Sequence, residues 1–307
     1  MKLFLKKLLL LTLVCAILAG VANFAFVQAR GSLSPAYVQR FIHAPEQIQV
    51  ANLGNSYGQN GFSYVDHPEL SSLNLAYGYQ TLAQDERVLS AYIDRFTKGS
   101  TLYIPVSYLS LIGGGYSGGD FLSLNRRFYY FLPRDQILSF SWREWLAVKV
   151  PGLFPPSWLA TFWESEEFDM TGAQSAVDTD VKAHATAMMQ AVLDATQNDT
   201  VYEPIQANVD CLYRIIKLCK EHDVTPVLIT TPFTRTYNEL VPPTFLKKQV
   251  DFLNAIAAEE GITYLDYSRD VRLIDRLDLF INSDHLNDKG ALVFTDLVLG
   301  NEPPVFE

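Results

Sequence analysis

Residues 47–58 read QIQVANLGNSYG, an apolar stretch that passes directly into a small polar turn. Ile48, Val50 and Leu53 give its first part the composition of a buried strand. The two glycines of the turn allow the backbone to bend sharply. A polar turn after a buried strand lies at the carboxyl edge of an open α/β sheet, where such folds place their binding sites. We therefore expect this stretch to supply the first strand and part of a functional site.

Apolar strands and amphipathic helices alternate along most of the remaining chain. Strands joined by helices form βαβ units, in which the strands are parallel and helices cover both faces of the sheet. The sequence therefore predicts an α/β fold, a three-layer α/β/α sandwich with a mostly parallel five-stranded sheet. The expected strands are residues 47–53, 72–76, 100–108, 224–231 and 262–265, and the expected helices cover about 82–96 (ending before Lys98 and Gly99), 205–219, 246–257 and 286–299.

The N-terminal segment has the length and composition of a membrane span. Residues 8–27 contain no charge, and Lys2, Lys6 and Lys7 precede them. Twenty helical residues measure about 30 Å, the thickness of the hydrocarbon core. Because basic residues stay on the cytoplasmic side, the chain after the span is expected outside the cytoplasm, periplasmic or at the cell surface. Residues 1–30 are thus predicted to be a single-pass anchor, with a signal peptide cleaved near Ala29 as the competing interpretation.

The rest of the chain is predicted to form one domain over residues 47–307, after a connector at 31–46. The segment from about 113 to 198 breaks the alternation of strands and helices, since it opens with glycine clusters and contains all four tryptophans. It is too long for an ordinary connection and is interpreted as an insertion over one end of the sheet. Its tryptophans are expected to pack within it, and a groove for a polysaccharide is the alternative.

Charge and cysteine content exclude several classes of function. The whole chain has a net charge of -10, and residues after 30 contain 20 basic and 34 acidic groups, so nucleic acid is an improbable partner. The sequence contains no metal-ligand spacing and no phosphate-binding or dinucleotide fingerprint, so no metal or cofactor is expected. Cys211 and Cys219 are eight residues apart on a predicted helix, about 12 Å, and are expected to be buried thiols.

Ser56 and His285 are the candidate nucleophile and base. Ser56 lies in the turn after the first strand, and His285 immediately precedes the last predicted helix, so both are expected at the same sheet edge. A serine hydroxyl requires such a base because it is scarcely ionised at neutral pH. Each residue also has a structural interpretation, Ser56 as part of a helix cap or plain turn and His285 as a capping or surface residue.

These two motifs together resemble the blocks of the SGNH/GDSL hydrolase family. Gly54-Asn55-Ser56 is similar to the Gly-Asp-Ser block that opens the family's fold, and 282–285, NSDH, is similar to its closing Asp-x-x-His block. The string SDHLNDKGA at 283–291 resembles branches linked to bacterial cell-surface polymers, such as membrane-tethered proteins of teichoic-acid D-alanylation. The resemblance implies a flavodoxin-like sandwich of the SGNH type and a serine esterase or acyltransferase.

The resemblance also suggests oxyanion and substrate contacts, and it shows departures from the family. Residues 74–81, NLAYGYQT, are similar to the second block, which makes Asn74 and the Gly78 N–H candidates. The third block lacks its asparagine, and Ser107 is the positional candidate there. The usual acid position holds Asn282. Three alternatives stay open: Asp284 is the acid, Asn282 orients the imidazole without charge, or neither acts.

The expected activity is ester hydrolysis or O-acyl transfer on a cell-envelope glycan or acylated polymer, with the acyl group supplied by a membrane-bound acyltransferase in the case of transfer. A non-catalytic polymer-binding or assembly protein on a degenerate scaffold is the alternative, and a peptidase has no positive feature. Arg235 and Tyr237 are further candidates for substrate contact. Structural or surface roles are expected for the remaining histidines, which are His43, His67, His184 and His222.

Overall fold

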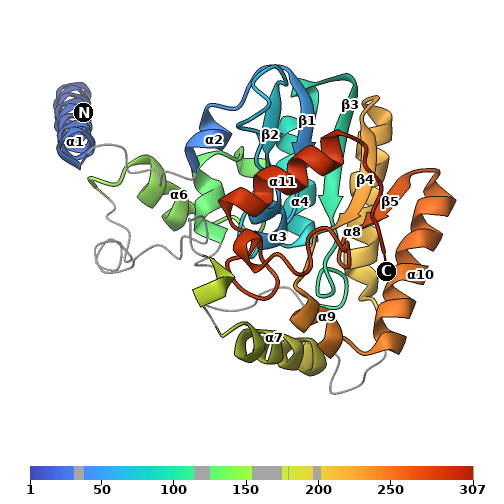
Figure 1. Ribbon diagram of the computed structural model, residues 1–307. Coiled ribbons are helices and arrows are strands. Elements are labelled where there is room, and N and C mark those ends of the chain that lie inside the picture. Colours follow the sequence, from blue (N-terminus) through green and yellow to red (C-terminus); the bar gives the residue numbers. More distant parts are fainter. Residues whose placement is uncertain (31–37, 114–124, 154–174, 179, 196–201, 307) are drawn as a thin grey trace. The chain divides into compact units, whose positions relative to one another are not determined.

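A parallel sheet organises the larger part of the chain, as the computed structural model shows (Figure 1). The structure describes residues 1–306 except 31–37, 114–124, 154–174, 179 and 196–201. Two compact units are distinguished. Unit 1 consists of Met1–His43 and Gly118–Phe168, and unit 2 consists of Ala44–Ser117 and Asp169–Glu307. Of the predicted insertion at 113–198, residues 114–124, 154–174, 179 and 196–198 lie outside the described residues, and its status as an insertion stays a prediction.

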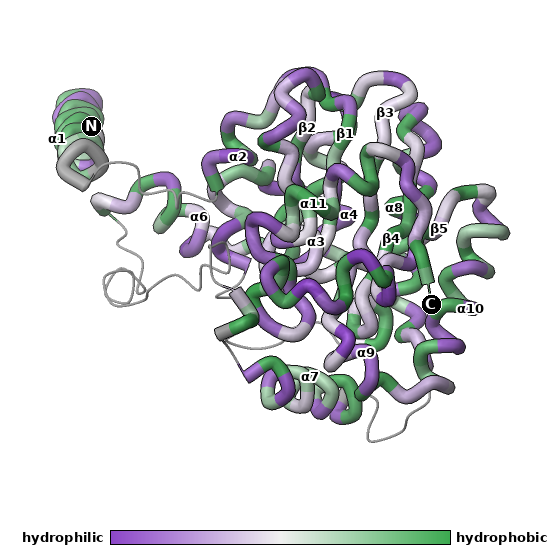
Figure 2. The backbone as a smooth tube through the Cα atoms, in the orientation of Figure 1, coloured by the Kyte–Doolittle hydropathy of each residue, from purple (hydrophilic) through white to green (hydrophobic). Residues whose placement is uncertain are grey.

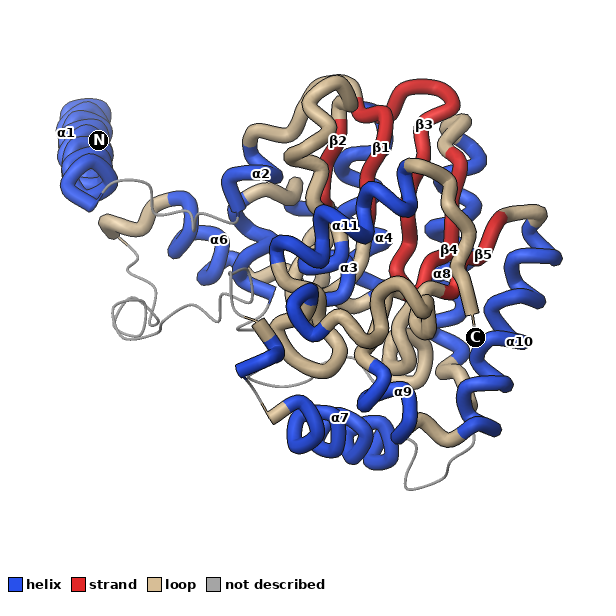
Figure 3. Tube along the Cα trace, in the orientation of Figure 1, coloured by secondary structure: helices blue, strands red, loops and turns tan. Residues whose placement is uncertain are grey.

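The sheet of unit 2 has the strand order β2-β1-β3-β4-β5, and all of these neighbours pair in parallel (Figure 3). This arrangement confirms the predicted α/β fold class. Parallel strands covered on both faces are expected to be apolar throughout, and the central strands β1 and β4 are buried at most of their positions. The strands are β1 Ile48–Asn52, β2 Ser72–Asn74, β3 Phe96–Pro105, β4 Thr225–Thr230 and β5 Thr263–Asp266.

Helices cover both faces of this sheet. In Figure 1, α3 and α11 lie in front of the strands and α4 and α8 lie behind them. Local sequence fixes where they begin: Thr81 and Gln84 form a capping box at α4, and the Asn287 side chain caps α11. The helices of unit 2 are α3 Ser56–Gly61, α4 Leu82–Tyr92, η2 Ile93–Arg95, η6 Ala176–Asp178, α7 Val181–Ala195, α8 Gln206–Glu221, α9 Arg235–Leu240, α10 Pro243–Glu260, η7 Leu277–Leu279 and α11 Asp288–Leu299.

One predicted helix boundary is wrong. Gly99 was expected to follow the end of a helix extending to Phe96, but α4 ends at Tyr92 and β3 already begins at Phe96. The register with β1 shifts within this part of β3, and Gly99 has φ +76°. A glycine with positive φ serves a β-bulge as readily as a helix end, and here it forms the bulge.

A hydrophobic core joins the sheet to α11 and to the segment before it. Phe294 of α11 packs edge-to-face against both Phe62 and Tyr267, at centroid distances of 5.4 and 5.2 Å. Cys211 and Cys219 are buried on α8, as predicted. The core positions the loop before α11, which contains His285, over the carboxyl edge of the sheet. Its buried members are Val50, Phe62, Tyr103, Ala176, Val181, Ile229, Tyr267, Leu273, Leu279, Phe280, Leu286, Phe294 and Val298.

Unit 1 contains the N-terminal helix α1, which is long and apolar enough over Lys2–Phe26 to cross a membrane (Figure 2). A signal sequence has the same properties, so the helix alone leaves both interpretations of the sequence open. The other described helices of this unit are short. They are α2 Gln39–Ile42, η3 Arg126–Tyr130, η4 Arg134–Gln136 and α6 Trp142–Lys149, after α1 Lys2–Arg30.

Candidate active site

The turn after β1 places Ser56 at the carboxyl edge of the sheet, as the first residue of α3. Gly54 has φ +115°, a conformation that favours glycine, and its N–H donates to the buried Asp85 carboxylate at 3.0 Å. The Asn55 side chain caps α3 by accepting from the Tyr57 N–H at 3.1 Å. A Cβ on Gly58 would lie 2.2 Å from the Leu53 carbonyl oxygen, so only glycine fits there. These contacts fix the backbone around Ser56.

His285 lies directly opposite this turn. Its Nε2 is 2.8 Å from Ser56 Oγ. Its Nδ1 faces two oxygens, Asp284 Oδ1 at 2.9 Å and Asn282 Oδ1 at 3.2 Å. Because both neighbours of Nδ1 are acceptors, the hydrogen-bond network assigns the ring proton to Nδ1 and leaves Nε2 to accept the Ser56 proton. This is the orientation that a general base for a serine requires.

Asp284 is the buried carboxylate of the group. Its Oδ1 accepts from His285, and its Oδ2 accepts from the Tyr57 hydroxyl at 2.7 Å. Burial by itself would raise the pKa of Asp284, but the electrostatic attraction of His285 and the hydrogen bonds from His285 and Tyr57 outweigh it and hold the pKa below the ordinary value. Asp284 is therefore ionised at neutral pH.

Asn282 shapes the same loop through its side-chain oxygen. This Oδ1 also accepts from the backbone N–H groups of Asp284 at 3.1 Å and of His285 at 2.9 Å. The carbonyl of Ser283, which lies between Asn282 and Asp284 in the chain, accepts hydrogen bonds from both the N–H and the hydroxyl of Thr234, at 2.9 and 2.7 Å. The loop that presents His285 is thus held by hydrogen bonds on both sides.

Tyr57 and His184 also contact this group, and neither is among the predicted site residues. The Tyr57 ring stacks on the His285 ring. His184, on α7, lies with Nδ1 2.8 Å from Ser283 Oγ and 3.7 Å from Asp284 Oδ1. Burial lowers the pKa of His184 below its ordinary value. The charge of Asp284 raises this pKa, and His285 lowers it further. A structural or surface role is expected for His184 from the sequence, and the structure places the residue beside the site through its contacts with Ser283 and Asp284.

No local pattern could have found His184. It lies about a hundred residues before His285, within the segment interpreted as an insertion. Tyr57 had a weak signal, since it directly follows Ser56.

The predicted oxyanion residues are all engaged within the protein. The Gly78 N–H donates to Gln59 Oε1 at 2.6 Å. The Ser107 N–H and hydroxyl both contact the Ser110 hydroxyl, at 2.8 and 3.0 Å. Gln59 follows Ser56 by three residues on α3, which places the two residues on one side of the helix. Gly78 and Ser107 therefore stay candidates as oxyanion donors.

Asn74 has a structural position instead. Its Nδ2 donates to the carbonyls of Gly58 and Gln59 at 3.2 Å and of Phe62 at 3.0 Å. Its Oδ1 accepts from Asn52 Nδ2 at 3.0 Å and from the Ala76 N–H at 3.0 Å. The Asn74 amide is thus used to join α3 to β2. These hydrogen bonds do not support the predicted contact between Asn74 and a substrate.

The predicted substrate contacts at Arg235 and Tyr237 also differ from expectation. Arg235 forms a bidentate ion pair with Asp275, with both distances 2.7 Å. Tyr237 is buried, and its ring is parallel to that of Tyr108 at 5.9 Å. Tyr237 belongs to the core, since its side chain is buried on α9 and packs against Phe233.

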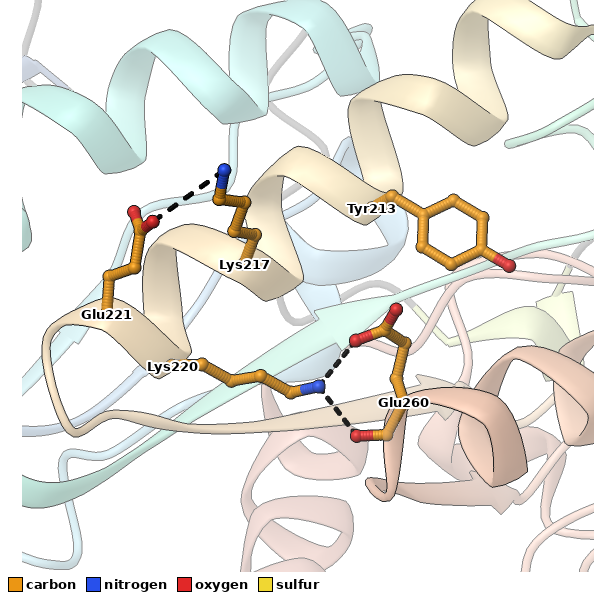
Figure 4. A pocket seen from close by; sticks show the side chains of 5 residues that line it. All are labelled: Tyr213, Lys217, Lys220, Glu221 and Glu260. Carbon is orange, nitrogen blue, oxygen red and sulfur yellow. Dashed lines mark hydrogen bonds and ion pairs between the residues drawn. The ribbon is translucent and has the colours of Figure 1, made fainter.

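A shallow hollow lies at the opposite edge of the sheet, between the ends of α8 and α10 (Figure 4). Tyr213, Lys217, Lys220, Glu221 and Glu260 line it. Its charged groups pair with one another: Lys220 contacts Glu260, and Lys217 lies 3.8 Å from Glu221. The residues that line this hollow include no serine, cysteine or histidine. Over the described residues, no group of three or more His, Cys, Asp or Glu side chains is placed to hold a metal ion.

Comparisons with known proteins give a likeness to solved structures alone. No family model matches the sequence, and no curated protein matches it either. Among solved structures, the chain is similar to a "putative acylhydrolase" from Bacteroides fragilis NCTC 9343, with 12% identity, a TM-score of 0.40, and coverage of 87% of this chain and 93% of that one. A likeness at this level shows nothing about the activity of this chain, which has to be inferred from its own residues.

Proposed function

We propose that the protein is a serine esterase or O-acyltransferase that works through an acyl-Ser56 intermediate. The observation that carries this proposal is the continuous contact from Ser56 Oγ to His285 Nε2, and from His285 Nδ1 to the buried Asp284 carboxylate, at 2.8 and 2.9 Å. Ser56 comes from an early part of the chain, and Asp284 and His285 come from a late part. Together they have the order, distances and tautomer that nucleophilic catalysis needs.

The reaction follows from these contacts. Ser56 Oγ attacks the acyl carbonyl carbon while His285 Nε2 takes the hydroxyl proton. Collapse of the tetrahedral intermediate breaks the ester bond, and His285 returns the proton to the departing alkoxide, which leaves as an alcohol. Water or an acceptor hydroxyl then attacks acyl-Ser56, again losing its proton to His285. The acyl group is released as an acid or a new ester, and the Ser56 hydroxyl is restored.

Asp284 is the proposed acid of the triad. Its charge lies 2.9 Å from Nδ1 and stabilises the imidazolium that forms in each half-reaction. Asn282 holds the loop and contributes a neutral dipole to the same nitrogen. Of the three alternatives left by the sequence, this arrangement favours the first, with Asn282 as an additional orienting group.

The oxyanion is proposed to bind at the N–H groups of Ser56 and Gly78, with Ser107 nearby. The amide oxygen of Gln59 now accepts from Gly78 and would be replaced by the substrate oxygen when an ester binds. Preorganised donors of this kind stabilise the charge of the tetrahedral intermediate.

The proposed location is extracytoplasmic, with α1 as a single-pass anchor. The apolar span of α1 and the lysines before it support this orientation. The proposed substrate is an acylated cell-envelope glycan or teichoic-type polymer, and the proposed donor in the transfer direction is a membrane-bound acyltransferase. The resemblance of residues 283–291 to envelope-linked SGNH branches supports both, as an analogy of motif.

A non-catalytic polymer-binding protein is the second candidate. The observation that favours it is the occupied state of the predicted oxyanion donors, since Gly78 and Ser107 both bond to neighbouring side chains. A binding protein would need no free oxyanion site. The ionised Asp284 buried behind His285 argues against it, because a buried charge is costly to keep without a use.

Turnover of p-nitrophenyl acetate by the full chain in detergent tests the proposal. The wild type is expected to release p-nitrophenol, and Ser56→Ala and His285→Ala are expected to lose the activity. Ser90→Ala is the matched serine control and is expected to keep most of it, because the Ser90 hydroxyl bonds to the Glu86 carbonyl within α4. Equal rates in wild type and Ser56→Ala would refute a serine-dependent reaction.

A further inference from the structure

Asn23 is an unusual residue in a membrane span, and the structure shows how its side chain is used. Within residues 8–27 the strongly polar side chains are Thr12 and Asn23. Thr12 donates to the Leu8 carbonyl of its own helix at 2.9 Å. Asn23 Oδ1 instead accepts from the backbone N–H of Gly152 at 3.0 Å. Polar groups in hydrocarbon need such partners, so this bond ties a second segment of unit 1 to the span.

The contact between the two segments is close. A Cβ added to Gly152 would lie 2.9 Å from Asn23 Cα and 3.1 Å from Phe26 Cβ. Glycine therefore allows the backbone after α6 to rest directly on α1, as small residues do where membrane helices pack.

The position of Asn23 along α1 sets the depth of this contact. Asn23 follows Lys7 by 16 residues, which corresponds to about 24 Å along a helix. The hydrocarbon core is about 30 Å thick. With Lys7 at the cytoplasmic boundary, the contact between Gly152 and α1 lies within the hydrocarbon core, a few ångströms from its opposite boundary.

The segment that ends at Gly152 has the side chains of a membrane interface. Trp142 is 55% exposed and Leu153 is 43% exposed. Trp142 packs edge-to-face with both Phe140 and Trp145, and the Arg134 guanidinium lies 4.3 Å from its ring centroid. Tryptophan is enriched where lipid headgroups meet the acyl chains, and its ring attracts the arginine cation.

The charge of this segment is opposite to that of the protein. Residues 125–153 contain five basic and two acidic residues, although the whole chain has a net charge of -10. One of the acids, Glu144, pairs with Arg126 at 2.7 Å. Arg134, Arg143 and Lys149 are exposed. Exposed cations beside a span attract anionic lipid headgroups.

We propose that residues 140–153 form a membrane-interface surface, seated among anionic headgroups of the leaflet that α1 reaches after crossing from the cytoplasm. The Asn23–Gly152 hydrogen bond holds this surface at the boundary. Arg134, just before this range, adds its charge to the surface through its contact with Trp142. The inference rests on the proposed membrane anchor and is independent of the chemistry of Ser56.

Fluorescence quenching by brominated lipids tests this surface in the full chain. Trp158→Phe and Trp163→Phe leave Trp142 and Trp145 as the emitters. In phosphatidylcholine–phosphatidylglycerol vesicles, lipids brominated near the headgroup are expected to reduce this emission by about half, and lipids brominated near the bilayer centre to reduce it less. Unchanged emission with both lipids would overturn the proposal.

A label on Cys15, the exposed thiol of α1, separates this outcome from failure of the anchor. Quenching of the Cys15 label without quenching of the tryptophans would refute the interface surface and keep the anchor. Quenching of neither would refute both, and neither result depends on esterase activity.

The hydrogen bond itself is tested by Asn23→Leu, with Thr12→Val as the matched control within the same span. Asn23→Leu removes the acceptor of Gly152 and is expected to lower the tryptophan quenching by about half. Thr12→Val is expected to leave it unchanged, because Thr12 bonds only to its own helix. Equal quenching in wild type and Asn23→Leu would contradict the holding role of this bond.

Discussion

Tyr57 and His285 lie face to face, with ring centroids 4.6 Å apart and ring planes 6° apart. The hydroxyl of the same tyrosine donates to Asp284 at 2.7 Å. One side chain thus contacts the proposed base and the proposed acid, and it belongs to the residue that follows the proposed nucleophile. The geometry of the site depends on Tyr57 as much as on the three residues that would perform the reaction.

Tyr57→Phe is expected to keep the stacking and lose the hydrogen bond to the buried carboxylate. Hydrogen bonds to charged groups contribute about 1.5–3 kcal/mol, so we expect lower thermal stability and about a tenfold or greater fall in kcat. Tyr108→Phe is the matched control, since its hydroxyl donates to the neutral Asn238 at 3.2 Å. An unchanged kcat in Tyr57→Phe would show that Tyr57 acts only through packing.

Asp284→Asn is expected to be the most damaging change at the loop. It removes the charge that stabilises the imidazolium, and we expect kcat to fall by about a hundredfold or more. Asn282→Ala removes a neutral partner of Nδ1 and is expected to cost about tenfold. Initial rates and thermal unfolding of both variants check this order. A larger fall in Asn282→Ala, with folding intact, would make Asn282 the principal orienting group.

His184 is a positioning residue in this account, because it contacts Ser283 and lies beside Asp284. His184→Ala is expected to lower kcat by about threefold to tenfold with little change in KM. His184→Gln can still bond to the Ser283 hydroxyl and is expected to recover most of the rate. His222→Ala, at the end of α8 on the far edge, provides the control. Failure of glutamine to rescue the rate would assign His184 a role other than this hydrogen bond.

Asp85 makes the stability of the fold depend on pH. Burial raises the pKa of Asp85 to about 6, against the hydrogen bonds from Gln80 and Gly54. A raised pKa means that the folded state prefers the protonated form of Asp85. The protonated carboxyl therefore contributes its full share of the stability below the unfolded pKa near 4, and this share is lost as pH rises through 6. Over that window we expect the wild type to lose up to about 3 kcal/mol relative to Asp85→Asn. A difference in unfolding free energy that stays constant between pH 4.5 and 7.5 would contradict this.

Local patterns were sufficient for most of the fold and for two of the site residues. The β-branched run at 224–231 and the helical spacing before it predicted β4 and α8 within a few residues. Gly99 was misinterpreted because a glycine with positive φ can end a helix or form a bulge, and only strand pairing distinguishes the two.

Contacts between distant parts of the chain could not be predicted in the same way. The Tyr57–Asp284 hydrogen bond joins residues 227 positions apart. The sequence left Asn282 and Asp284 as alternatives, since a turn of four residues can direct either side chain at the imidazole. The folded loop directs both, and the shorter contact is with the carboxylate.

Covalent trapping of Ser56 tests the central claim most directly. The full chain is treated with a fluorophosphonate, digested and analysed by peptide mass spectrometry, with His285→Ala treated in parallel. The account predicts one adduct on the peptide that contains Ser56, and its loss in His285→Ala, because the hydroxyl is reactive only when Nε2 accepts its proton. An unmodified Ser56 peptide in the folded wild type would contradict an activated nucleophile and favour the polymer-binding alternative.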